Sequence, residues 1–116
     1  MGKFTKKVIL SSKDKKKEID LLIDTGADTS IINEDLANEL KLIKIGSTMV
    51  KGINTIGKGD ITVIGIEVNG CKGHYIATIK KDAENIMGAN VLQQLDAEVD
   101  MKNKDITIRR CEPYRA

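Results

Sequence analysis

The chain is poor in aromatic residues, and this scarcity limits how its interior can be built. It has no tryptophan, and aromatic residues make up only 3% of its 116 residues. Hydrophobic residues make up 41%, with isoleucine and valine prominent, so the core has to be aliphatic. Because β-branched residues favour strands, the composition predicts a β-rich fold. The length fits one domain, 1–116, and no repeat or linker divides it.

Residues that commonly bind metals are also scarce. Cys71 and Cys111 are far apart without CxxC spacing, and His74 is the one histidine. This pattern excludes the usual zinc sites and predicts no metal and no other cofactor. Since two cysteines do not form a disulfide framework, we expect free thiols in a reducing compartment, and hence a cytoplasmic protein. We expect His74 to be a surface residue of a strand.

The sequence also lacks a strong charge imbalance and any long apolar run. Its formal net charge of +2 is too small to indicate a nucleic-acid partner, and the lysine-rich stretch 13–18 is typical of a solvated turn. The first apolar run, Val8–Leu10, is too short for a signal peptide or a membrane span. We therefore expect no nucleic-acid partner and no membrane partner.

The distribution of apolar residues predicts mainly strands, with two short helices. One helix is expected from Asn33, its cap, to Leu40, and the other over 89–95 with Asn90 as its candidate cap. Strands are expected at 8–10, 18–24, 30–32, 97–101 and 105–108, and hairpins over 47–66 and over 64–79 around Asn69-Gly70.

The most informative motif is Asp24-Thr25-Gly26. The apolar run Leu21–Ile23 leads directly into a carboxylate, and Gly26 lets the backbone turn back sharply. This places Asp24 at the exposed end of a buried strand, where it can act as an acid or a base. An aspartic protease needs two such carboxylates, and the motif occurs once. The chain therefore supplies half of an active site, or it is not a protease and Asp24 is a structural turn residue.

The order of the motifs resembles the retropepsins, the homodimeric aspartic proteases of retroviruses, retrotransposons and some cellular genomes. The segment Leu22–Asp28 is close to the active-site segment of that family, and Asn85–Leu92 resembles the segment that buttresses its catalytic loop. The resemblance covers residues 7–108. It implies an all-β acid-protease fold with two short helices, a closed β-barrel-like monomer and a C2 homodimer.

In such a dimer the catalytic residues are Asp24, Thr25 and Gly26 of each chain. Two carboxylates about 3 Å apart share one proton, because like charges at that distance repel strongly. The ionised one takes a proton from water, and the protonated one donates a hydrogen bond to the scissile carbonyl. Thr25 would hold the two loops together, and Gly26 would let the substrate approach. The implied function is an aspartic endopeptidase that hydrolyses a protein or peptide bound in an extended conformation.

Two segments are expected to bind the substrate. The first follows the catalytic tripeptide and consists of Ala27 and Asp28, of which Asp28 binds the peptide backbone by resemblance. The second is the tip of the glycine-rich hairpin, which is expected to close as a flap: Gly52, Ile53, Asn54, Thr55, Ile56 and Gly57.

The chain departs from the viral pattern at several positions. Ala89 stands where the viral enzymes carry an arginine that braces the aspartate corresponding to Asp28, so Asp28 needs another partner or stays solvated. Such departures are commoner among cellular retropepsins, which favours a cellular or retroelement-derived member. The tail 109–116 has no viral counterpart.

The alternative function is a catalytically inactive, dimeric peptide-binding module of the same fold. A third function class, phosphoryl transfer from Asp24, is weaker, because the sequence has no P-loop motif.

Overall fold

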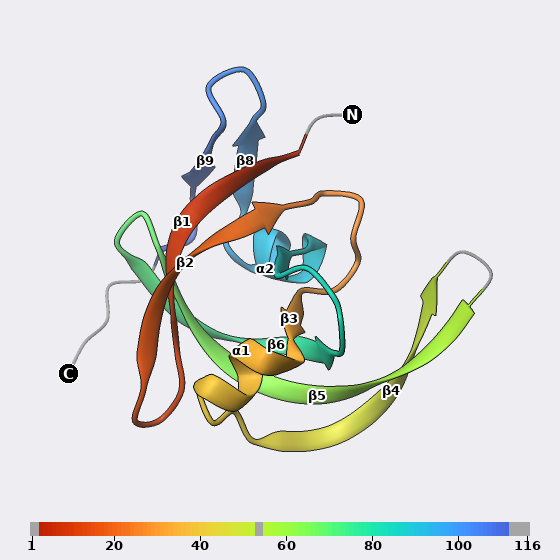
Figure 1. Ribbon diagram of the computed structural model, residues 1–116. Helices are drawn as coiled ribbons and strands as arrows, with labels where there is room; N and C mark the ends of the chain where they lie inside the picture. Colours follow the sequence, from red (N-terminus) through yellow and green to blue (C-terminus); the bar gives the residue numbers. More distant parts are fainter. Residues whose placement is uncertain (1–2, 53–54, 112–116) are drawn as a thin grey trace.

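The computed structural model describes residues 3–52 and 55–111. Over these ranges the chain forms mostly strands, with two short helices (Figure 1). The elements are β1 (Phe4–Ser11), β2 (Lys16–Ile23), β3 (Ile31–Asn33), α1 (Glu34–Glu39), β4 (Lys44–Gly52), β5 (Thr55–Val68), β6 (Cys71–Lys80), β7 (Ile86–Met87), α2 (Ala89–Gln94), β8 (Ala97–Asp100) and β9 (Asp105–Ile108). The predicted class, mainly β with two short helices, is confirmed.

Seven strands form one sheet in the order β1-β2-β7-β3-β6-β5-β4. The strand β1 pairs with β2 along its whole length and also with β5 over Ile9–Ser11. The remaining strands, β8 and β9, form a separate hairpin. Figure 1 shows that the β4–β5 hairpin curves away from the rest of the chain toward its tip. The main sheet therefore combines a packed body with one long projecting hairpin.

The core is aliphatic, as the composition predicts. Leu10, Leu21 and Ile64 are fully buried, and the aromatic residues buried with them are Phe4 and Tyr75. Burial raises the pKa of the Tyr75 hydroxyl, because the charged phenolate is poorly solvated there. The core includes residues of β2, the strand that ends just before Asp24. Packing therefore holds this strand in place and sets the direction in which the chain enters the Asp24 turn.

The helix caps follow the sequence prediction at one helix and depart from it at the other. Asn33 caps α1, since its side-chain oxygen accepts a hydrogen bond from the Asp35 N–H at 2.8 Å. In α2 the cap is Gly88, and no side chain caps the helix. The prediction of Asn90 as the cap is wrong, because the Asn90 amide points to other partners, Ser30 and Ile76.

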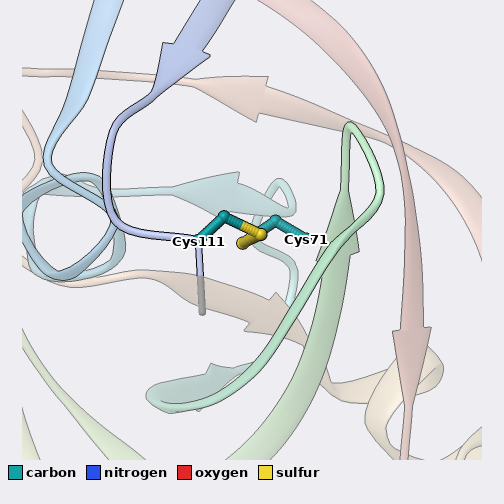
Figure 2. The surroundings of a disulfide bond; sticks show 2 residues. All are labelled: Cys71 and Cys111. Carbon is teal, nitrogen blue, oxygen red and sulfur yellow. A yellow bond between two sulfur atoms is a disulfide. The ribbon is translucent and has the colours of Figure 1, made fainter. Parts of the chain in front are cut away.

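The two cysteines are joined in a disulfide bond, so the prediction of free thiols is wrong (Figure 2). The Cα atoms of Cys71 and Cys111 are 5.5 Å apart although 40 positions separate them in sequence. They meet because the chain after β9 turns back, and the N–H groups of Arg109 and Arg110 donate to the Leu95 carbonyl. The expected cytoplasmic location rested partly on free thiols and loses that support.

None of the helices in the described part of the chain is long and apolar enough to cross a membrane.

Candidate active site

Asp24 lies immediately after β2, where that strand runs parallel to β7. The Asp24 N–H donates to the Met87 carbonyl at 3.1 Å, which continues the pairing of Ile23 with Met87. The turn then folds back on the carboxylate: the Gly26 N–H donates to Asp24 Oδ1 at 3.0 Å, and the Ala27 N–H donates to the Asp24 carbonyl at 3.2 Å. The side chain of Asp24 is only 16% exposed. A rigid strand therefore presents one oriented carboxylate at the surface.

The first turn of α2 supports this loop through the backbone. The Ala89 N–H donates to the Ala27 carbonyl at 2.6 Å, and the Asn90 N–H donates to the Asp28 carbonyl at 3.2 Å. Gly88 makes the close approach possible, because a Cβ atom there would lie 2.8 Å from the Ala27 carbonyl oxygen and closer still to that of Thr29. The resemblance of this second segment to a buttress of the catalytic loop thus has a physical basis.

A buried polar network fixes the loop from the other side. Ser30 is 1% exposed, and its N–H and hydroxyl both donate to Asn90 Oδ1, at 2.9 and 2.8 Å. The Ser30 oxygen accepts a hydrogen bond from the Gly88 N–H at 2.9 Å, and the Asn90 amide donates to the Ile76 carbonyl at 2.7 Å. The sequence analysis missed this role of Ser30 and Asn90, because hydrogen-bond partners 60 positions apart leave no local pattern.

A second contact that the sequence did not predict is an ion pair. Lys3 Nζ lies 3.5 Å from Asp24 Oδ2, and the lysine side chain is 55% exposed. An ion pair with one partner so exposed contributes about 0–1 kcal/mol to stability. Lys3 therefore places a positive charge beside the Asp24 carboxylate, but this weak ion pair does not hold the carboxylate in position.

The other predicted site residues on this loop have different surroundings. Thr25 and Gly26 are exposed, and Ala27 is half-buried. Asp28 is exposed, and within residues 3–52 and 55–111 its carboxylate has no ion-pair partner. Of the two outcomes expected where Ala89 replaces an arginine, another partner or solvation, the single chain shows solvation. Thr25 borders a hollow of about 340 Å³, which α2 and β8 also line.

The described part of the predicted flap, Gly52 and Thr55–Gly57, lies at the end of the β4–β5 hairpin. Gly52 pairs with Thr55, and Val50 pairs with Gly57, so the hairpin extends to the predicted tip. Ile53 and Asn54 lie outside the described residues. The closing of this hairpin over a substrate stays a prediction.

The described residues contain no group of three or more side chains able to hold a metal ion. The chemistry that the loop offers is that of a carboxylate oriented by one backbone N–H group, that of Gly26, at the end of a strand, as in an aspartic-type hydrolase.

Comparison with known proteins agrees with this class. The family model described as aspartyl protease matches residues 11–91, a span that contains both the Asp24 loop and Gly88. The chain therefore belongs to this aspartyl protease family. Among solved structures, the protease of the retrovirus EIAV, in complex with the inhibitor HBY-793, is similar over 85% of this chain and 93% of its own. The sequences are 25% identical and the TM-score is 0.72. No curated protein sequence matches significantly.

These findings confirm the resemblance to retropepsins and the enzyme class. The chain is an aspartic-type endopeptidase, a hydrolase with a fold similar to that of a retroviral protease.

Proposed function

We propose that two copies of this chain form a C2 homodimer whose two Asp24 carboxylates hydrolyse an extended peptide. The observation that carries the proposal is the single Asp24 loop, which belongs to a family whose chemistry needs two carboxylates. A two-fold axis beside Asp24 would supply the second one, since an isologous contact repeats every residue. The pairing of β1 with β5 supports the accompanying proposal of a closed, barrel-like monomer.

The surface around Thr25 supports a partner at this position. The hollow beside Thr25 is lined by residues of α2 and of the chain around β8; the apolar ones are Ala89, Leu92, Ala97 and Val99, and the polar ones are Gln93 and Asp96. A second copy would cover these apolar groups and bring Thr25 of both chains together.

In the proposed dimer the two carboxylates share a single proton, because like charges so close repel strongly. The ionised Asp24 takes a proton from a water molecule, whose oxygen attacks the scissile carbonyl. The protonated Asp24 donates a hydrogen bond to the carbonyl oxygen. Collapse of the tetrahedral intermediate then breaks the C–N bond, and the leaving nitrogen takes the proton that the first Asp24 accepted from the water, which restores the singly protonated pair. The Gly26 N–H keeps the carboxylate of its own chain oriented through these steps.

The flap completes the proposal. The hairpin ending in Gly52–Gly57 would close over the peptide and exclude water, while Ala27 and Asp28 contact the peptide backbone. Backbone hydrogen exchange at Thr55–Gly57 should slow when a peptide-like inhibitor is added. Unchanged exchange would show that the hairpin is fixed.

The proposal is tested by sedimentation and cleavage measured on the same samples. Over micromolar concentrations the chain should pass from monomer to dimer, and cleavage of a peptide library should rise with the dimer fraction. A monomer that cleaves peptides would contradict the mechanism. A dimer that binds peptides without cutting them would favour the inactive binding module.

A further inference from the structure

The large apolar side chains that are exposed in the described part of the chain are concentrated on one surface. Four of the five lie on or beside β4, β5 and β6, and only Met101 lies elsewhere. We call these four residues the apolar strip: Ile43 (70% exposed), Ile45 (60%), Val63 (45%) and Ile76 (58%). Large exposed apolar patches mark binding surfaces more often than scattered single residues do.

The residues of the strip are neighbours. Val63 and Ile76 stand opposite each other in the β5–β6 pairing, so both point away from the core on the same face of the sheet. Val63 and Ile76 line a hollow of about 690 Å³, while Val63, Ile43 and Ile45 line a second hollow of about 220 Å³. Val63 thus joins two hollows into one continuous surface.

The charged residues at these hollows are basic. Lys13 and Lys41 line the smaller hollow, and Arg110 lines the larger one. Neither hollow is lined by an aspartate or glutamate among the described residues. Electrostatic complementarity therefore favours an occupant with both apolar and acidic side chains. A second copy of this chain fits poorly, because a two-fold contact would bring the same lysines face to face.

The larger hollow reaches the residue that directly follows the Asp24–Asp28 loop. Its lining includes Thr29, next to the predicted substrate-binding residue Asp28, and Asn90, which supports the catalytic loop. A peptide that leaves the active site past Asp28 can therefore continue into this hollow and reach Ile76 and Val63.

We propose that the apolar strip is a docking surface for the substrate protein. It takes an acidic segment rich in leucine or isoleucine, which lies in the substrate beyond the bond that is cut. This inference rests on the proposed function, and it adds a substrate class: proteins with such a segment near the cleavage site.

Direct binding tests the surface without requiring catalysis. The probe is a fluorescein-labelled peptide of alternating glutamate and leucine, and fluorescence anisotropy is measured with the Asp24→Asn protein, so that the probe stays intact. We expect it to bind about ten-fold more tightly than the corresponding lysine–leucine peptide at low salt, where charge complementarity is least screened. Equal binding of the two probes would overturn the charge argument.

Substitutions then locate the binding surface. The triple variant Ile43→Thr, Val63→Thr, Ile76→Thr keeps β-branched residues in place and should weaken binding of the acidic probe about five-fold or more. Its control is Met101→Thr, which removes an exposed apolar side chain outside the strip and should leave binding unchanged. Lys13→Glu with Lys41→Glu should also weaken binding, whereas Lys102→Glu, in the β8–β9 turn, should not.

Kinetics link the strip to the substrate. A peptide that the wild type cleaves is compared with the same peptide extended by the glutamate–leucine segment. The extension should lower KM, the triple variant should abolish that gain, and kcat for the unextended peptide should stay unchanged. Equal KM values for both peptides would overturn the docking proposal while leaving the proposed protease function intact. If the wild type cuts no member of a peptide library, so that this comparison has no starting peptide, the proposed function fails, and the anisotropy result still decides the docking surface.

A second copy of the chain is the competing occupant of the apolar strip. If the triple variant sediments as a monomer where the wild type and Met101→Thr are dimers, the strip is an interface between copies, and the substrate proposal is wrong.

Discussion

The catalytic loop and the β4–β5 hairpin are both expected to contact the substrate, and the protein holds them in opposite ways. The loop is fixed from two sides, by backbone hydrogen bonds to α2 and by buried Ser30. In contrast, β4 pairs only with β5 among the strands described, and the hairpin projects from the body (Figure 1). The catalytic loop is thus restrained by more contacts than the hairpin, which fits an aimed carboxylate in the first case and, under the proposed function, a lid that opens in the second.

The largest expected effect is the loss of catalysis in Asp24→Asn. The substitution keeps the shape of the side chain but removes the carboxylate that accepts and donates the proton. Turnover should fall about 10³-fold or more, as general acid–base groups typically contribute 10²–10⁴-fold. The fold and the hairpin should be unchanged by circular dichroism and hydrogen exchange. Asp20→Asn, an exposed position on the same strand, is the control and should retain full activity. Near-normal turnover of Asp24→Asn would show that another group is catalytic.

The next effect in size concerns the disulfide, which closes a chain segment that contains α2. Because the two cysteines are 40 positions apart, the bond is expected to contribute about 4 kcal/mol to stability. Cys111→Ala removes the bond at its exposed end and leaves buried Cys71 in place. Thermal unfolding should occur at a clearly lower temperature, and hydrogen exchange should rise in α2 and after it but not in β4. A reductant should lower the unfolding temperature of the wild type and leave that of Cys111→Ala unchanged.

Two glycines provide a direct contrast between the rigid region and the free one. Gly88→Ala would place a Cβ against the carbonyls of Ala27 and Thr29, so stability should fall by about 1–3 kcal/mol. In the hairpin, a Cβ at Gly46 would meet only the Ile61 side chain at 3.8 Å, an ordinary contact. Gly46→Ala should therefore change stability by less than about 1 kcal/mol. Denaturant unfolding of both variants measures the difference, and equal losses would show that α2 does not restrain the loop more tightly.

The sequence predicted well those features that depend on neighbouring residues. The strands, both helices, the Asn33 cap and the turn at Asn69-Gly70 follow from local periodicity and turn chemistry, and the structure contains them. The first strand was predicted too short, because Lys6 and Lys7 break the apolar run and hide that the strand begins at Phe4, which packs into the core. The Asp24 turn was found because strand, carboxylate and glycine are consecutive.

The missed features depend on residues that are far apart in the chain. The disulfide, the bonds from Ser30 to Asn90 and the ion pair of Lys3 with Asp24 form only once the sheet brings distant segments together. The Asn90 prediction failed for the same reason, since a local capping role was outcompeted by tertiary partners. A single sequence gives no signal for such contacts beyond the residue types themselves.

The smallest expected effect is a change in stability when the link between the β8–β9 hairpin and β1 is removed. Lys6 Nζ donates to Asp105 Oδ1 at 2.8 Å, and this bond, followed by that from the Ile106 N–H, lowers the pKa of the Asp105 carboxyl. A lowered pKa means that the stabilisation is present at neutral pH and is lost as the pH falls through the folded-state value. Lys6→Gln should therefore be slightly less stable than the wild type near pH 7. The difference should begin to shrink as the pH falls below about 4, the usual aspartate pKa, and should vanish only below the lowered pKa of folded Asp105.

Lys102→Gln, in the turn of the same hairpin, is the control for this measurement and should match the wild type at every pH. Denaturant unfolding from pH 3 to pH 7 gives the comparison directly. A difference between Lys6→Gln and the wild type that persists unchanged at pH 3 would mean that Lys6 acts through the packing of its alkyl chain. In that case apolar contacts would attach the hairpin to the sheet, and charge would play no part. The hairpin would then differ from the catalytic loop, which hydrogen bonds hold in place.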